Sequence, residues 1–80
     1  MTSAVVFTFV GADQPGLVEK LAQTVALHGG NWLESRMSEL AGQFAGIVQV
    51  EVGDAQFPAL RAALLALSSD DLSVVVASSK

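Results

Sequence analysis

The order in which apolar residues change their spacing constrains the fold of this chain more than any other feature. Residues 4–10 form a β-branched and aromatic run with one polar member, which suits a strand buried on both faces. Residues 15–28 then place apolar side chains at helical spacing, with the charged side chains outside that stripe. The change predicts a strand followed by an amphipathic helix.

Both ends of this helix carry residues that favour a helix boundary. Asp13 or Gln14 can cap the N-terminus, and Pro15 suits the first turn because the N–H that proline lacks would be unpaired there. Gly29 and Gly30 are expected to end the helix, since glycine accepts the left-handed conformation common after a C-terminus.

A β-hairpin is predicted next, with strands at 31–39 and 44–52 and a turn at 40–43 that contains Gly42. If Glu39 lies opposite Phe44, the side chains separate into a mostly apolar face and a mostly polar face. The apolar face holds Leu33, Ser35, Met37, Gly46, Val48 and Val50. The polar face holds Trp32, Glu34, Arg36, Ile47, Gln49 and Glu51.

The remainder of the chain predicts one more helix and one more strand. Apolar residues recur at three- and four-residue steps over 55–68, a valine-rich strand follows at 72–77, and 78–80 is a tail. The order strand, helix, strand, strand, helix, strand is typical of the α+β ferredoxin-like fold. We therefore expect a single domain over 1–80, with two helices on one face of a four-stranded antiparallel sheet.

Charge and cysteine content exclude several functions. The net charge of −4 argues against direct nucleic-acid binding, which requires clustered Lys and Arg. The absence of cysteine rules out disulfides, thiolate catalysis and cysteine-ligated zinc. No apolar run approaches the ~18 residues of a membrane helix, and no basic segment precedes the first apolar run. A cytoplasmic protein with no bound metal or cofactor is the expectation.

The residues available for catalysis are few, so we expect no enzymatic activity. His28 is the one histidine, and its position at the end of the first predicted helix suits contact with the terminal carbonyl groups. Acylphosphatase chemistry occurs on the same general fold and uses an arginine in the first loop, where this chain has Asp13. A small enzyme of that type stays open as the least favoured alternative.

Only 15% of the residues are charged, against ~25% in an average soluble domain, which suggests that part of the surface is covered by a partner. The outward face of the predicted hairpin is the place where we expect such contact, because tryptophan and isoleucine lie there. The predicted interface residues are Trp32, Glu34, Arg36 and Ile47.

Two loop segments, Gly11-Ala12-Asp13-Gln14-Pro15-Gly16-Leu17-Val18 and His28-Gly29-Gly30-Asn31, resemble those of ACT domains. The hairpin segments Ser35-Arg36-Met37 and Gly42-Gln43-Phe44-Ala45-Gly46 add to the resemblance. It covers nearly the whole chain and is greatest to the ACT domains of glycine cleavage system transcriptional repressor-like proteins. Formyltetrahydrofolate deformylase, which begins with a similar domain, is a second relative, but its catalytic domain has no counterpart here.

In ACT domains resembling this one, small amino acids bind where the first loop of one copy meets the start of the second strand of another. The resemblance therefore implies a ligand of the glycine or serine class and a regulatory role exerted through protein–protein contact. The implied binding residues are Gly11, Ala12, Asp13, Gln14, Pro15, Gly16, Gly30 and Asn31. Expected partners are a second copy or a second ACT domain, and a transcriptional regulator or an enzyme.

The chain departs from the repressor-like pattern because those proteins usually carry two ACT domains in tandem, whereas this sequence holds one. Many ACT-like domains also bind no ligand and serve as assembly modules. A ligand-free structural module is therefore the main alternative to an amino-acid sensor.

Overall fold

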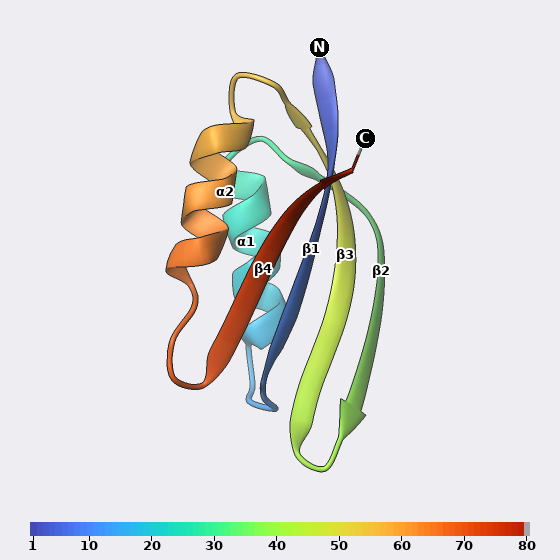
Figure 1. Ribbon diagram of the computed structural model, residues 1–80, viewed down its shortest axis with the longest axis vertical. Helices are drawn as coiled ribbons and strands as arrows, with labels where there is room; N and C mark the ends of the chain where they lie inside the picture. The colour runs from blue at the N-terminus through green and yellow to red at the C-terminus, as the bar shows by residue number, and fades with distance from the viewer. Residues whose placement is uncertain (80) are drawn as a thin grey trace.

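The computed structural model describes residues 1–79 and contains six regular elements in the predicted order (Figure 1). Their bounds are β1 Thr2–Ala12, α1 Leu17–Leu27, β2 Asn31–Leu40, β3 Gln43–Gly53, α2 Phe57–Ala66 and β4 Leu72–Ser79. The predicted tail at 78–80 is wrong in its first two positions, which belong to β4, and Lys80 lies outside the described residues.

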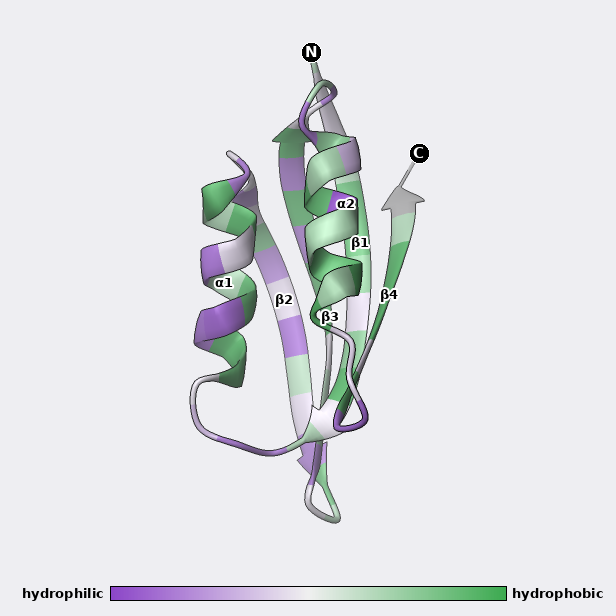
Figure 2. Cartoon of the chain, turned by 90° about the vertical axis from the view of Figure 1, so that its left-hand side faces the viewer, coloured by the Kyte–Doolittle hydropathy of each residue, from purple (hydrophilic) through white to green (hydrophobic). Residues whose placement is uncertain are grey.

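The four strands form one antiparallel sheet in the order β2-β3-β1-β4. Figures 1 and 2 show α1 and α2 together on one face of this sheet, so the other face has no helical cover. The predicted ferredoxin-like architecture is confirmed. Strands β2 and β4 lie at the edges, whereas β1 and β3 are internal.

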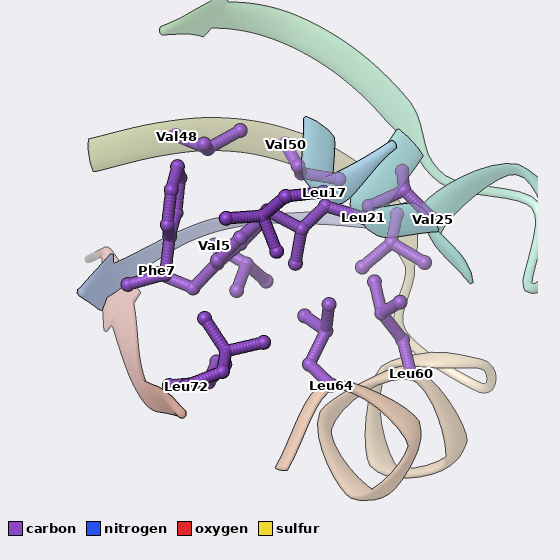
Figure 3. Packing of buried hydrophobic residues seen from close by; sticks show 13 residues of the cluster. Val5, Phe7, Leu17, Leu21, Val25, Val48, Val50, Leu60, Leu64 and Leu72 are labelled. Carbon is purple, nitrogen blue, oxygen red and sulfur yellow. The ribbon is translucent and has the colours of Figure 1, made fainter. Parts of the chain in front are cut away.

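The core lies between the helices and the sheet, and Figure 3 shows its side chains converging from both layers. Alternate residues of β1, β3 and β4 meet residues from the inner faces of both helices. The buried set is Val5, Phe7, Phe9, Leu17, Leu21, Val25, Val48, Val50, Val52, Leu60, Leu64, Leu72 and Val74.

Strand β1 is buried on one face only, so the prediction of two-sided burial is wrong. Phe7 and Phe9 are buried under the helices, whereas Thr8 is exposed and Val10 is 49% exposed on the face that no helix covers. The prediction was wrong because most residues on the outward face of this run are also apolar. Only the tertiary arrangement decides that both helices cover the same face.

Helix α1 begins later than predicted, because its N-cap is Gly16 with φ 82°, a left-handed conformation that favours glycine. Pro15 therefore precedes the helix, and within residues 1–79 no side chain forms an N-cap hydrogen bond to it. At the C-terminus, Gly30 N–H donates to Val25 C=O and Gly29 N–H donates to Ala26 C=O, which is a Schellman motif. The predicted C-terminal stop is correct.

The β2–β3 hairpin closes through a two-residue turn, Ala41–Gly42, in which both residues have positive φ. Two positive φ values are the mark of a type I′ turn, whose twist matches that of the flanking strands. Helix α2 is shorter than the predicted 55–68, because it begins at Phe57 with Pro58 in its first turn.

The predicted hairpin register is correct from the Ser35–Val48 pair to the Glu39–Phe44 pair, and it is wrong at the start of β2. Glu39 pairs with Phe44 as expected, but a β-bulge between Trp32 and Glu34 shifts the pairing, so that Trp32 lies opposite Val50. The Trp32 ring consequently packs edge-to-face on Phe7 with centroids 6.2 Å apart, on the helix-covered face. Leu33 takes the exposed position instead, at 49%.

Candidate functional site

The β1–α1 loop, residues 12–16, is fixed by backbone hydrogen bonds to two neighbouring loops. Ala12 N–H donates to Asp71 C=O at 3.1 Å, and Asp13 N–H donates to Gly42 C=O at 3.1 Å. The second bond ties the loop to the turn of the β2–β3 hairpin. The predicted binding loop therefore has a defined position at the end of β2, beside the edge of the sheet.

The start of α1 opens into this loop and can hold an anion. The first backbone N–H groups of a helix have no partner within the helix, and they lie at the positive end of its dipole. Here the N-cap is a glycine, and among the residues that the structure describes no side chain forms a cap hydrogen bond to these groups. Asp13, Gln14, Pro15 and Gly16, which lead into the helix, are all exposed.

Glu39 is a neighbour of the loop that the sequence did not point to. It is exposed near the end of β2, and a side-chain hydrogen bond with Asp13, together with the negative charge of Asp13, raises its pKa. Two carboxyl groups therefore lie next to the helix N-terminus. Their pairing depends on the loop folding back onto the hairpin, which no local sequence pattern reveals.

The second half of the predicted site, Gly30 and Asn31, lies at the opposite end of the sheet (Figure 1). Asn31 pairs with Glu51, which pairs with Ala4 of β1, whereas the loop follows Ala12. Eight residues of extended strand correspond to about 26 Å at about 3.3 Å per residue. Within one copy the two halves of the site do not meet.

Two glycines of the predicted site have packing reasons to be glycine. A Cβ at Gly30 would lie 2.7 Å from Val25 Cγ1, and a Cβ at Gly11 would lie 2.6 Å from Asp71 C=O. Neither position needs a ligand to account for the missing side chain. By contrast, no described atom would come within 4 Å of a Cβ at Gly16, so that glycine is required by its backbone conformation alone.

Three of the four predicted interface residues lie on the helix-free face of the sheet, and Trp32 does not. The β-bulge places Trp32 on the helix-covered face, where it is half-buried against the core. Ile47 is 47% exposed on the helix-free face. Beside it, Arg36 Nη2 and Glu34 Oε2 form an exposed ion pair at 3.0 Å.

His28 has the local role that its position favoured. It is half-buried, and its Nδ1 lies 2.9 Å from Thr24 C=O, one helical turn back, where a protonated Nδ1 donates to the carbonyl. Within residues 1–79 no group of three or more metal-ligating side chains comes together. Neither described helix has the length and apolar character needed to cross a membrane.

The sequence matches the family model of the ACT domain over residues 3–76, nearly the whole described chain. This protein therefore belongs to the ACT domain family. ACT domains are regulatory modules that bind amino acids. A search of curated proteins gave no match.

Solved structures show the same fold. A protein assigned as a glycine cleavage system transcriptional repressor superposes with a TM-score of 0.93 at 21% identity, over 100% of this chain and 47% of its own. An unknown protein from Galdieria sulphuraria gives 0.77 at 26% identity, over 100% and 46%. Formyltetrahydrofolate deformylase from Pseudomonas putida gives 0.78 at 16% identity, over 91% and 28%. This chain thus spans about half the length of the first two relatives.

Proposed function

We propose that this chain is a regulatory module that pairs with a second ACT domain and binds a small amino acid where the two meet. The observation that carries the proposal is the position of the two predicted half-sites, at opposite ends of β2. The loop at Asp13 lies beside the end of β2, and Asn31 begins it. A site that uses both halves therefore needs a second domain.

The free edge of β2 suits such pairing. Strand β2 has ten residues and lies at the edge of the sheet, where its outer backbone groups are available to another strand. Antiparallel pairing of β2 with β2 of a second copy places the start of one strand next to the end of the other. Asn31 of one copy then approaches the β1–α1 loop of its partner, and a two-fold axis produces two such sites.

The charges on β2 favour the same arrangement. Glu34 and Arg36 lie on the same face of the strand, one on each side of Ser35. A register centred on Ser35 places Glu34 of each copy opposite Arg36 of the other, and opposite charges across an antiparallel pair are stabilising. We therefore propose Glu34 and Arg36 as interface residues of this pairing.

The loop offers partners for both charged groups of an amino acid. The N–H groups at the start of α1 suit the carboxylate, and the carboxyl groups of Asp13 and Glu39 suit the ammonium group. A ligand without a large side chain, such as glycine or serine, fits a site built from backbone and short loops. The proposed affinity falls as the pH drops through the raised pKa of Glu39, because protonation removes one negative partner of the ammonium group.

Ligand binding at a shared site would stabilise the paired state over the separated chains. The output is then contact with a regulated partner, an enzyme or a transcriptional regulator in the cytoplasm. In this proposal the chain itself has no catalytic role. No direct contact with nucleic acid is proposed either, given the net charge of −4.

Isothermal calorimetry with glycine, serine and larger amino acids tests ligand binding, and two variants test whether the site is shared. Asp13→Ala and Asn31→Ala should each abolish binding, whereas Arg61→Gln, which removes one charge from the exposed face of α2, should not. An equimolar mixture of the two defective chains should regain binding at about one quarter of the wild-type stoichiometry, because random pairing makes half of the pairs mixed and each mixed pair holds one intact site of two. If the mixture of the two variants binds no ligand, the site is not shared between two chains.

The ligand-free assembly module is the second candidate, and the packing roles of Gly11 and Gly30 support it. This alternative predicts that the chain forms pairs without ligand and that calorimetry detects no heat of binding with any amino acid at millimolar concentration. An acetyl phosphate hydrolysis assay checks the least favoured alternative, and we expect no turnover.

A further inference from the structure

The side chain of Gln56 extends from the start of α2 toward the α1–β2 loop, residues 28–30. Figure 1 shows the α1–β2 and β3–α2 connections at the same end of the molecule, where β2 begins. Gln56 is the N-cap residue of α2, yet within residues 1–79 its side chain forms no cap hydrogen bond. Side chains at this position commonly cap the helix. The amide group of Gln56 is therefore free for a role outside its own helix.

The amide group of Gln56 faces Gly29 with its flat side. A Cβ at Gly29 would lie 3.7 Å from both Cδ and Oε1 of Gln56 and 3.8 Å from Nε2. Because these three distances are nearly equal, the Cβ position lies over the plane of the amide group and not at its edge. Apart from the chain neighbours of Gly29, the three atoms nearest to this position all belong to Gln56. Gln56 therefore covers the loop at Gly29.

Gly53, the last residue of β3, leaves room for the same amide group. A Cβ at Gly53 would lie 2.8 Å from Oε1 of Gln56, which is too close for an ordinary contact. Apart from chain neighbours, the atoms that would come within 4 Å of this Cβ all belong to Gln56. Gly53 does not share the positive φ of Gly29, so its backbone conformation does not require glycine. Its missing side chain is explained by the position of Gln56.

The backbone of Gln56 is fixed on both sides, which gives its side chain a defined starting point. Its N–H donates to Gly53 C=O at 2.9 Å, and its C=O accepts from Leu60 N–H at 3.0 Å. Leu60 is fully buried in the core, so the first turn of α2 is anchored to the sheet. A side chain that starts from a rigid turn can hold a neighbouring loop in place.

The loop that Gln56 covers leads into the second predicted half-site. Gly29 and Gly30 are adjacent glycines, and Asn31 follows them directly. Glycine has the greatest conformational freedom of any residue, so such a loop needs contacts to stay in one conformation. The N–H groups of Gly29 and Gly30 bond back to α1, whereas Gln56 connects the loop to α2.

We infer that Gln56 is a positioning residue, which holds the α1–β2 loop in the conformation that presents Asn31 to the ligand. The inference rests on the proposed function for the identity of the ligand site, but the effect on the loop exists without ligand. A loop that is ordered beforehand removes an entropic cost from ligand binding, so the affinity increases.

Hydrogen exchange of backbone amides, followed by NMR without ligand, tests this role with Gln56→Ala. The exchange of the Gly29 and Gly30 N–H groups reports how often the loop opens, because both donate to the end of α1. We expect both to exchange about tenfold faster in the variant, while Leu21 N–H in the middle of α1 is unchanged. Gln23→Ala is the matched control, since Gln23 is exposed on α1 and undergoes the same chemical change. It should alter neither loop amide.

Gly53→Ala tests the same contact from the other residue. The new Cβ should displace the Gln56 amide, so it should speed the exchange of the loop amides as Gln56→Ala does. In the double variant the two effects should not add, because the contact is already lost. Circular dichroism and urea denaturation show whether each variant is folded. Additive effects would assign the two changes to separate causes and would contradict a role through Gln56.

Calorimetry then connects the loop to the ligand site. We expect Gln56→Ala to raise the dissociation constant of glycine or serine about tenfold, because the ligand must then order the loop. Mixing this variant with Asp13→Ala should restore sites of wild-type affinity, since each mixed pair holds one site with an intact β1–α1 loop and an intact Asn31 half. Mixing it with Asn31→Ala should not, because both defects lie in the same half.

The exchange and binding results can fail separately. Unchanged exchange at Gly29 and Gly30 in Gln56→Ala would overturn the inference whether or not a ligand binds. An unchanged dissociation constant, or restoration by Asn31→Ala in place of Asp13→Ala, would overturn it as well. If the wild type binds neither glycine nor serine, the proposed function fails, and the exchange measurement alone decides whether Gln56 holds the loop.

Discussion

Gly30 allows a sharp test of how the predicted ligand site is built, because two explanations exist for its missing side chain. Either a ligand approaches the backbone there, or the core leaves no room. A Cβ at this position would lie 2.7 Å from Cγ1 of Val25 and 3.1 Å from Cγ1 of Val50. Those valines are 2% and 0% exposed, so neither can rotate toward solvent to relieve the contact.

Gly30→Ala should therefore over-pack the core, at a cost of about 1–3 kcal/mol. An 80-residue domain has a free energy of unfolding of roughly 4–12 kcal/mol. Because 1 kcal/mol shifts the Tm of a domain of this size by roughly 4–8 °C, we expect Tm to fall by about 5–20 °C. Urea denaturation and thermal melts followed by circular dichroism measure the change without any ligand.

A double-mutant cycle with Val25→Ala identifies the cause. Removing the valine methyl groups makes room for the new Cβ, so Val25→Ala should cost at least about 1 kcal/mol less beside Gly30→Ala than in the wild type. Gly16→Ala is the comparison, because its cost of about 1–2 kcal/mol comes from positive φ and should add independently to that of Val25→Ala. Additive costs at Gly30, or an unchanged Tm, would refute the packing explanation.

Three further changes test other features. Ala41 has φ 54° in the hairpin turn, so Ala41→Gly should raise the free energy of unfolding by about 1 kcal/mol in urea denaturation, and a loss would contradict the turn geometry. Asp13 raises the pKa of Glu39, so the folded chain binds that proton more tightly than the unfolded chain, and stability falls as pH rises from the ordinary Glu value through the raised one. Glu39→Gln should remove this dependence of the free energy of unfolding on pH. If the pH dependence is the same in the variant, the Asp13–Glu39 pair is not its cause. Trp32→Ala should cost about 2–4 kcal/mol because it removes the Phe7 contact, whereas Leu33→Ala should cost under about 1 kcal/mol. A larger cost for Leu33→Ala than for Trp32→Ala in urea denaturation would contradict the bulge.

The architecture was predictable because each element carries its own period in the sequence. Two helical stripes and four alternating or β-branched segments leave few arrangements, and all six elements formed within a few residues of their expected bounds. The strand ends were underestimated at Thr2 and Ser79. Strand pairing can extend through polar residues that have no strong preference of their own.

The errors concern features that depend on tertiary contacts. A bulge at Leu33 inverts the faces before it, and nothing in the local sequence distinguishes it from a regular strand. The start of α1 moved from Pro15 to Leu17 because the loop is fixed by Gly42 and Asp71 from elsewhere in the chain. The contact of Glu39 with Asp13 has the same origin, because the hydrogen bond of the loop to Gly42 holds it beside the end of β2. The residues of the candidate site could be proposed from loop patterns in the sequence. The position of its two halves at opposite ends of the sheet could not be predicted in this way.

The central position of β1 in the sheet has a consequence for how the chain folds during translation. Strand β1 is synthesised first, yet its partners on β3 lie 31 to 51 positions later and those on β4 lie 61 to 75 positions later. Such distant pairing slows folding, since a long loop must close before the contact contributes. On the ribosome, the apolar run Ala4–Val10 therefore stays unpaired until β3 has been synthesised, and an unpaired apolar strand of this kind is prone to aggregate.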